Sequence, residues 1–493
     1  MKILLIHPPD SKVSIVPGRF EPLGLEVLAA VLPDHDVRIL DLRIDHYRVM
    51  DRQIDTFKPI VIGITVNNSV HVNQALRLIT YIHDQYPDII QVVGGHHATM
   101  LSADFRIPGV HAIFLGWAEK SFPEYIECLE HRKPFDQVQG IEILDQGELR
   151  VHNDIRHDLQ ASEIPLPRRD LVERYLKKYH SDMGFRTSLV NTTRGCAYRC
   201  SFCGVWQASG GQFIIRSAED VCNEIVSLPK FIHRVFFADD NTFLNPENAL
   251  KLCRMIKEAK IRKKYSGYCR SDTITRYPDM MREWKEIGLD NLCVGFETTS
   301  NVHLGELNKK NTIANNEQAA RILNDIGIPF RPHFIIDPGF EKEDFIRVMH
   351  YVTKNHLKSP IFPILTPIPG TMYHSEVKDH IILNYDYFDF AHAVVPTRLS
   401  PRDFYTAWIH LYFLSYPVRK NLKLFFLKTF ASITRNKDSV KKNSHLRLIN
   451  LLMLRLVGIF LWVKLVRHYH ALGKMKNQSL HGRGTRISTI SDT

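Results

Sequence analysis

Short apolar runs alternate with amphipathic stretches through the first 130 residues of the chain. We predict strands over the runs and helices where apolar positions recur every three to four residues. The predicted strands are Lys2–His7, Val37–Asp41, Ile60–Val66, Ile89–Gly94 and Ala112–Leu115. The predicted helices are Leu23–Leu32, Asn73–His83 and Phe122–Leu129. This order predicts an open parallel sheet with helices on both faces, which binds ligands at the carboxyl ends of its strands.

A second alternation of the same kind begins near residue 185. The predicted strands are 187–193, 233–238, 265–270, 290–296, 329–336 and 361–366. The predicted helices are 217–228, 246–260, 277–287, 312–326 and 341–355. Six such units predict a partial (β/α)6 barrel, with its chemistry on the loops at the carboxyl ends of the strands.

The two alternations divide the chain into four parts. We expect a Rossmann-like first domain over residues 1–135 and a barrel of TIM type over 181–400. A polar connector punctuated by proline is expected over 136–180, and a mostly helical, basic region over 401–493. The predicted fold class is therefore α/β with a helical C-terminal region.

Charge is concentrated in the tail. The formal net charge of the chain is +11, but residues 417–493 alone hold 16 Lys and Arg and only two acids. A basic tail favours an anionic surface, such as membrane headgroups or nucleic acid. Nucleic acid is not expected, because the tail is rich in apolar residues and contains no recognised binding module.

The tail contains two apolar-basic stretches, Leu422–Ile433 and Leu446–Arg467. The longest uncharged run in the second is the eight residues Leu456–Val463, whereas a spanning helix needs about 20 apolar residues. Two interpretations stay open: an amphipathic helix lying in the headgroup plane, or a helical cap packed on the barrel. We expect a cytoplasmic protein, either free or peripheral on the inner face of the membrane.

Three of the eight cysteines lie within eight residues, in the segment Arg194-Gly-Cys196-Ala-Tyr-Arg-Cys200-Ser-Phe-Cys203. The other five are scattered, which favours a reduced compartment over a disulfide framework. A C-x3-C-x2-C loop supplies three thiolates to a [4Fe–4S] cluster and leaves one iron without a protein ligand. A zinc site normally takes four ligands, and no fourth Cys or His follows in Gly204-Val205-Trp206. We therefore assign Cys196, Cys200 and Cys203 to a cluster.

This motif resembles that of the radical S-adenosylmethionine (SAM) superfamily. The resemblance implies that SAM binds the open iron and is cleaved to a 5′-deoxyadenosyl radical, with an electron from an external flavodoxin or ferredoxin. It also implies SAM contacts for side chains that follow the barrel strands, and no catalytic side chain beyond the cofactors. The implied SAM-binding residues are Phe202, Asp239, Asp240, Arg270 and Glu297.

The first domain is similar to the cobalamin-binding domain of the cobalamin-dependent radical SAM class, through its Gly-Gly-His-His segment and through Glu21-Pro-Leu-Gly-Leu25. The implied cobalamin contacts are Asn67, Asn68, Gly94, Gly95, His96 and Gly116. The D-x-H-x-x-G signature is absent, so we expect base-off cobalamin with no histidine on cobalt. The segment Gly116–Glu119 departs from the G-E-G-E pattern usual in relatives. Methylthiotransferases need three further N-terminal cysteines, but residues 1–180 contain only Cys128.

Over residues 1–410 the chain looks most like the hopanoid C-3 methylase family, most specifically at His392–Leu399. The resemblance implies methyl transfer from SAM, through methylcobalamin, to an unactivated carbon of a hopanoid or a related lipid. One alternative is a cobalamin-binding radical SAM enzyme that cyclises, rearranges or hydroxylates its substrate without net methylation. Another is a noncatalytic carrier with a structural cluster.

Overall fold

The computed structural model describes residues 1–14, 18–182 and 184–415. It separates into two compact units. Of the described residues, the first unit contains 1–337 and 350–396, and the second contains 338–349 and 397–415. The predicted tail helices at Leu422–Ile433 and Leu446–Arg467 lie outside the described residues.

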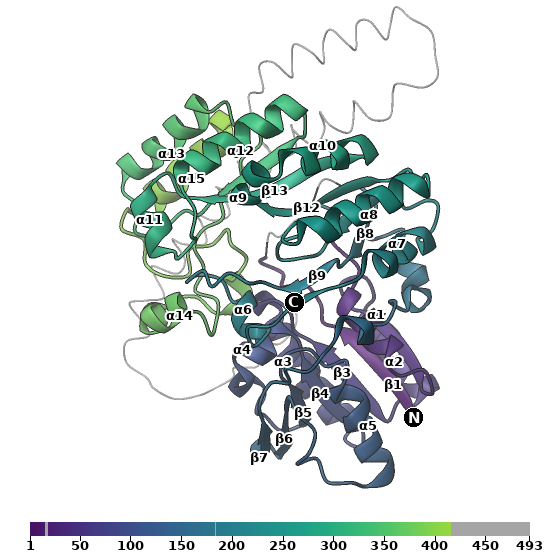
Figure 1. The fold of residues 1–493 in the computed structure, drawn as a ribbon. Coiled ribbons are helices and arrows are strands. Elements are labelled where there is room, and N and C mark those ends of the chain that lie inside the picture. Colours follow the sequence, from purple (N-terminus) through teal and green to yellow (C-terminus); the bar gives the residue numbers. More distant parts are fainter. Residues whose placement is uncertain (15–17, 183, 416–493) are drawn as a thin grey trace, which may run out of the picture. The chain divides into compact units, whose positions relative to one another are not determined.

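The N-terminal sheet has seven strands in the order β2-β1-β3-β4-β5-β6-β7 (Figure 1). The strands are β1 (Lys2–His7), β2 (Asp36–Asp41), β3 (Val61–Thr65), β4 (Ile90–Gly94), β5 (Val110–Phe114), β6 (Ile141–Asp145) and β7 (Glu148–Asn153). β1 to β5 pair in parallel, and all five were predicted within two residues because their apolar runs are almost completely buried.

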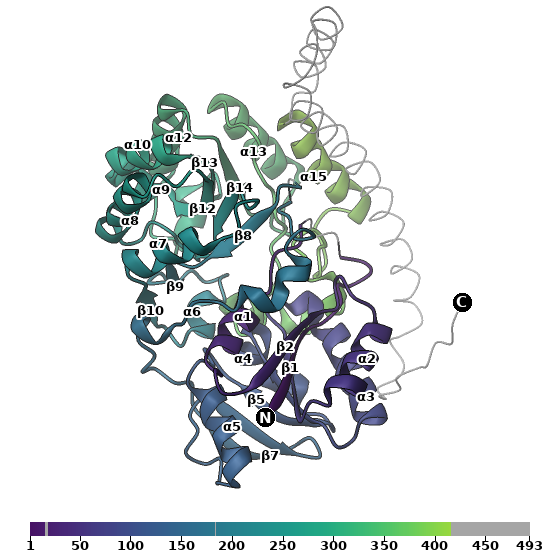
Figure 2. The same cartoon turned by 90° about the vertical axis from the view of Figure 1, so that its right-hand side faces the viewer.

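Helices cover both faces of this sheet (Figure 2). One core joins the sheet to α2 (Tyr47–Phe57) and α3 (Val72–Gln85). The other core joins the opposite face to α1 (Leu23–Ala30) and α5 (Ser121–His131). The short helix α4 (His96–Met100) follows β4 directly. α2 was not predicted, because its buried residues Met50, Ile54 and Phe57 lie among charged positions.

The connector is less irregular than expected. β6 and β7 form an antiparallel hairpin that pairs with β5 and extends the sheet past residue 135. β7 was missed because its side chains are mostly exposed and polar, so the alternation that marks a half-buried strand is weak. The rest of the connector contains the short 3-10 helices η3 (Ala161–Glu163) and η4 (Arg169–Tyr175).

The second sheet has five parallel strands in the order β14-β13-β12-β11-β8. They are β8 (Thr187–Val190), β11 (Arg234–Phe237), β12 (Lys264–Arg270), β13 (Leu289–Glu297) and β14 (Phe330–Phe334). The intervening helices include α7 (Ala218–Ser227), α8 (Pro246–Glu258), α9 (Ser271–Arg276), α10 (Pro278–Ile287), α11 (Asn301–Glu306) and α12 (Ile313–Ile326). This is the predicted β/α succession of a partial barrel.

The sixth predicted strand, 361–366, is only partly formed. It joins β14 through isolated bridges, His333 to Ile361 and Ile336 to Ile364. The sequence there is Pro360-Ile-Phe-Pro363, and proline has no N–H to give to a ladder.

The outer face of the second sheet holds an aromatic core. Phe237 stacks on Tyr265, with 5.8 Å between ring centroids, and Trp284 of α10 meets both rings edge-on. These side chains are fully buried. Since neighbouring residues of a strand point to opposite faces, Phe236 and Tyr268 lie on the inner face.

The second unit contains the start of α13 (Lys342–Lys354) and α15 (Pro401–Ser415). The rings of Phe345 and Phe404 meet edge-on, with their centroids 5.5 Å apart, and Arg398 pairs with Glu341 at 2.6 Å. Within the described part of the chain, no helix is both long enough and apolar enough to cross a membrane.

Candidate radical SAM and cobalamin sites

The cysteine loop follows β9 (Thr193–Gly195), which pairs antiparallel with β10 (Phe213–Ile215) in a small two-stranded sheet. Gly195 has φ +73°, and a Cβ at this position would lie 2.1 Å from the carbonyl oxygen of Gln212. Only glycine fits there, so the residue before Cys196 is fixed by the pairing of the two strands. The predicted strand 187–193 is thus split between β8 and β9.

The three thiols of this loop lie close enough to influence one another electrostatically. Burial raises the pKa of Cys196 and Cys200, and it raises the pKa of Cys203 to about 12. The described residues contain no group of three His, Cys, Asp or Glu side chains already arranged around a metal position. Neutral thiols gain nothing by converging, whereas bound iron would deprotonate them. The donor set therefore fits a cluster in its chemistry.

Arg270 and Asp272 support the cysteine loop from the end of β12. The guanidinium of Arg270 lies 3.6 Å from the ring centroid of Tyr198, inside the loop, and donates to both oxygens of Asp272. It also donates to the carbonyl of Lys309 at 2.7 Å. Its polar atoms are thus largely engaged with protein, so its implied contact with SAM requires a rearrangement.

The two acids after β11 differ in their surroundings. Asp239 is 3% exposed and accepts bonds from the N–H groups of Thr192 and Thr193 and from the Thr192 hydroxyl. It therefore supports the turn before β9. Asp240 has an exposed carboxylate, although surrounding protein atoms raise its pKa to about 6. Of this pair, Asp240 is the one accessible to a ligand.

Asn241 is a candidate that was not among the predicted contacts. Its side chain is 1% exposed, and neither amide atom has a hydrogen-bond partner among the described residues. Such unmet polar atoms at a strand end are typical of a site that expects a polar ligand. The sequence signal was its place in Asp239-Asp240-Asn241.

Glu297 ends β13 in a strained conformation, with φ +64°. Its Oε1 accepts a bond from buried Lys309 at 2.5 Å, and a Cβ on Gly295 would lie 2.2 Å from that oxygen. Gly295 thus makes room for the Glu297–Lys309 pair. Lys309 was not predicted, because nothing in sequence links it to a residue twelve positions earlier. Phe202, the remaining implied SAM residue, is half-buried beside Cys203.

The implied cobalamin contacts lie at the carboxyl edge of the N-terminal sheet. Asn67 and Asn68 are exposed after β3. Gly95 has φ +110°, and a Cβ there would lie 2.8 Å from the Asn67 side-chain oxygen. Gly116, after β5, donates its N–H to the Thr99 hydroxyl of α4 at 2.9 Å. The structure therefore brings the ends of β3, β4 and β5 together, as predicted.

The two histidines at this edge, His96 and His97, differ in their hydrogen bonding. His97 is buried, with Nδ1 2.9 Å from the Ser69 hydroxyl and Nε2 2.9 Å from Asp104. Both of its nitrogens are occupied by protein. His96 has an exposed side chain whose pKa is lowered by surrounding protein atoms, so it is neutral near pH 7. The arrangement is consistent with packing and lining roles.

The cysteine loop and the cobalamin edge contact each other inside the first unit. Arg194, two residues before Cys196, forms a short ion pair with Glu119 of the Gly116–Glu119 loop, and both side chains are largely buried. Met100 of α4 lies against Gly204 and Gly370. The loop that departs from the usual pattern therefore binds the strand that leads into the cysteines.

A buried charge network joins the same two domains. Arg169 of η4 donates to the Leu189 carbonyl at 2.6 Å and pairs with Glu224 at 2.8 Å. Its Nε lies 3.6 Å from Glu21, which accepts bonds from the Ser188 hydroxyl and the Leu189 N–H at 2.6 Å. This network anchors the connector to β8 and to the segment before α1.

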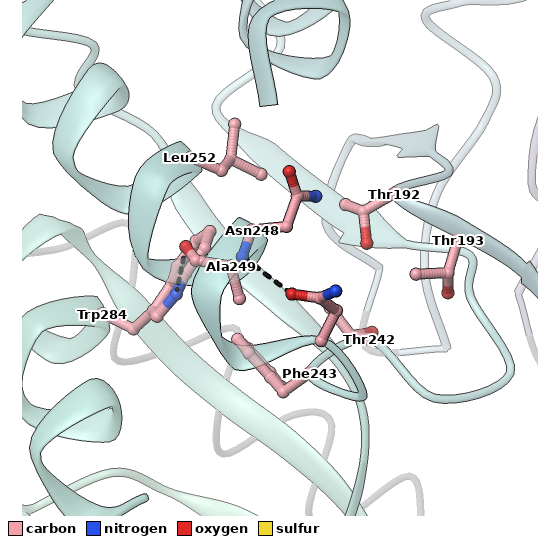
Figure 3. Close-up of a pocket in the computed structure, with 9 residues that line it drawn as sticks. Thr192, Thr193, Thr242, Phe243, Asn248, Ala249, Leu252 and Trp284 are labelled. Atoms are coloured by element: carbon pink, nitrogen blue, oxygen red, sulfur yellow. Dashed lines mark hydrogen bonds between the residues drawn. The ribbon is translucent and has the colours of Figure 1, made fainter. Parts of the chain in front are cut away.

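One enclosed cavity lies between β9 and the first turn of α8 (Figure 3). Its volume is about 10 Å³, near the lower limit of what admits one water. The Thr193 and Thr242 hydroxyls line it and have no hydrogen-bond partner among the described residues. It is far too small for a cofactor or an organic substrate.

Comparisons with known proteins match both domains in which these candidate sites lie. Residues 190–352 match the radical SAM superfamily, and residues 13–126 match the B12 binding domain. The chain is 27% identical over 412 residues to the hopanoid C-3 methylase of Methylococcus capsulatus, covering 82% of this chain and 78% of that protein. It is 24% identical over 442 residues to the anaerobic magnesium-protoporphyrin IX monomethyl ester cyclase of a Synechocystis species, covering 83% and 84%.

The solved structure of the radical SAM methyltransferase TsrM from Kitasatospora setae, with cobalamin and a [4Fe-4S] cluster bound, has the same fold. Its TM-score is 0.65 at 20% identity, covering 77% of this chain and 78% of that one. The predicted fold class and the three cofactors, [4Fe–4S] cluster, SAM and cobalamin, are confirmed. The chain thus combines a radical SAM domain with a B12 binding domain and is similar to cobalamin-dependent radical SAM methyltransferases.

Proposed function

We propose that the methyl acceptor of this enzyme is an unactivated carbon of a hopanoid or a related polycyclic lipid. Support comes from the hopanoid C-3 methylase relative, which matches along most of both chains. The observation that carries methyl transfer is the contact between the two cofactor sites, through the Arg194–Glu119 pair and through Met100. Radical formation and methyl delivery need to occur next to each other.

Cys196, Cys200 and Cys203 would hold the cluster, which supplies with SAM the radical able to take hydrogen from an inert carbon. Asp240 and Asn241 would offer polar atoms to SAM, while Asp239, Arg270 and Lys309 keep the surrounding loops in place. The edge formed by Asn67, Asn68, Gly94, Gly95, His96 and Gly116 would hold cobalamin. Gly95 and Gly116 allow a close approach there, because both have positive φ and no side chain.

An external electron donor is needed to reduce the cluster, and we propose a flavodoxin or ferredoxin for this role. We also propose that the basic C-terminal region rests on the membrane surface, where a polycyclic lipid is found. This proposal is supported by the charge of residues 417–493, which hold 16 basic and only two acidic residues.

The cyclase relative favours a second candidate, radical chemistry on a large ring system without net methylation. The two differ in the fate of the SAM methyl group. Anaerobic incubation of the holoenzyme with a hopanoid and with SAM labelled in its methyl group decides between them. We expect a labelled lipid heavier by one CH2, together with 5′-deoxyadenosine and S-adenosylhomocysteine.

Cys200→Ala is the control for this experiment, since it should abolish 5′-deoxyadenosine formation and the labelled lipid together. A lipid product without label would favour the second candidate. Undiminished 5′-deoxyadenosine from Cys200→Ala would contradict the cluster assignment itself.

A further inference from the structure

The inner face of the second sheet carries an exposed aromatic residue at its centre. Tyr268 lies on β12, the middle strand of five (Figure 1), yet the residue is 42% exposed. In a closed barrel, side chains from all strands fill the interior. The exposure of a large aromatic residue on a strand with neighbours on both sides therefore leaves its ring accessible to a ligand.

Aromatic rings continue from Tyr268 in both directions across this face. Phe236 of β11 meets Tyr268 edge-on at 5.5 Å between centroids, and His333 of β14 does so at 6.2 Å. Phe20 precedes the first helix, and its ring centroid lies 5.8 Å from that of Phe236. We call Phe20, Phe236, Tyr268 and His333 the aromatic wall.

The aromatic wall ends where the SAM-facing residues begin. Tyr268 precedes Arg270 by two residues on β12 and therefore shares its face. Gly295 pairs with His333 in register, two residues before Glu297. Asp240, the accessible acid after β11, influences Tyr268 electrostatically. A molecule lying on the wall would thus reach the carboxyl ends of β11, β12 and β13.

The wall carries no net charge. Arg331, the other inner-facing polar residue of β14, is ion-paired with Asp182. Burial lowers the pKa of His333 to about 4, so its imidazole is neutral near pH 7. Surrounding protein atoms raise the pKa of the Tyr268 phenol above its ordinary range, although part of the residue stays exposed, and burial raises the pKa of the adjacent Cys293 thiol to about 11. Glu297 and Lys309, which also act on His333, are paired with each other, so Asp240 at the edge of the wall is the acid left accessible to a ligand.

We propose that the aromatic wall binds the uncharged, flat hydrocarbon skeleton of the substrate, with Tyr268 as its principal contact. This proposal rests on the methyl transfer proposed above and names the surface that selects the acceptor. Aromatic rings give a flat hydrocarbon a large contact area at small entropic cost, and such rings often dominate binding energy. The phenol hydroxyl and the His333 Nε2, which has no partner among the described residues, are the polar groups at hand.

The test measures retention of the substrate separately from turnover. Anaerobic holoenzyme is mixed with deuterated hopene in detergent micelles and desalted, and the retained hopene is quantified by mass spectrometry. The variants are Tyr268→Phe, Tyr268→Ala and Tyr268→Glu, with iron and cobalamin content measured for each. Val226→Glu is the matched control, since Val226 lies on α7 with 59% exposure.

We expect Tyr268→Phe to stay within about threefold of wild type, because it keeps the ring. Tyr268→Ala should retain about tenfold less hopene, and Tyr268→Glu essentially none, at unchanged iron and cobalamin content. Val226→Glu should behave as wild type. Equal retention by Tyr268→Glu and wild type would overturn the proposal, as would a wild type that retains no hopene.

The two proposals fail differently. If wild type retains hopene and Tyr268→Glu does not, but no methylated lipid forms, the aromatic wall stands and the proposed reaction is wrong. If methylated lipid forms and Tyr268→Glu makes it as well as wild type, the reaction stands and the wall is wrong.

Discussion

Replacing Arg169 by alanine should destabilise the protein far more than the same change at its neighbour. The Arg169 side chain is 10% exposed, and its partners Glu21 and Glu224 are each 1% exposed. Removing the guanidinium leaves carboxylates out of water, with only Glu224 still paired, to Arg216 at 2.6 Å. Breaking a buried ion pair by deleting one partner costs about 3–5 kcal/mol.

Arg168→Ala provides the comparison, because Arg168 pairs with Asp170 at the surface with 42% and 58% of their side chains exposed. Exposed pairs contribute about 0–1 kcal/mol. Urea unfolding of both variants, followed by circular dichroism under anaerobic conditions, measures the difference. Unfolding of Arg169→Ala at the same urea concentration as Arg168→Ala would contradict this prediction, since the network would then contribute no more than a surface pair.

Three further changes test other parts of the structure. Glu26 is fully buried without a partner for either oxygen among the described residues, and burial raises its pKa well above 4.5. The free energy of unfolding of wild type should therefore fall as pH rises above 4.5, because the buried carboxyl must then be ionised or hold its proton at a cost. In urea titrations, Glu26→Gln should be more stable than wild type toward pH 8 and no more stable than wild type near pH 4.5. Gly195→Ala should lose bound iron, because its Cβ would meet a backbone oxygen at 2.1 Å. Gly184→Ala, with φ +75° but open space around it, should keep its iron. Both His97 nitrogens are engaged by protein, so we expect no histidine on cobalt. The electron paramagnetic resonance spectrum of bound cob(II)alamin should therefore show no splitting from a histidine nitrogen, either in wild type or in His96→Ala. A nitrogen splitting that is present in wild type and lost in His96→Ala would contradict this assignment.

The sequence predicts elements well where burial alone decides them. β1 reads as an unbroken apolar run because both of its faces are covered by helices, and α12 was predicted within one residue at its start from its apolar spacing. The hairpin β6–β7 was not predicted. β7 is mostly exposed and carries little pattern, whereas β6 is a short buried apolar run that was included in the polar connector.

Site residues could be predicted where they lie in one loop. They could not be predicted where residues distant in sequence are brought together only by the fold. The cysteine spacing indicates a cluster without any structure. The pairing of Glu297 with Lys309 depends on the turn after β13, and the anchoring of Asp239 depends on how β9 leaves β8. Asp239 and Arg270 were predicted as SAM contacts, yet in the structure their polar atoms mainly hold neighbouring backbone and side chains.

The prolines at 360 and 363 limit what can pair with this side of the half-barrel. Backbone bonds still run in both directions between residues 361–365 and 332–336: the N–H groups of Phe334 and Ile336 donate at 2.8 Å, and those of Ile361 and Leu365 donate at 2.9 Å. The segment therefore follows β14 as a strand would, but Pro360 and Pro363 remove two donors from it. A strand short of donors is a poor template for a foreign strand, so this side of the half-barrel is protected against aggregation.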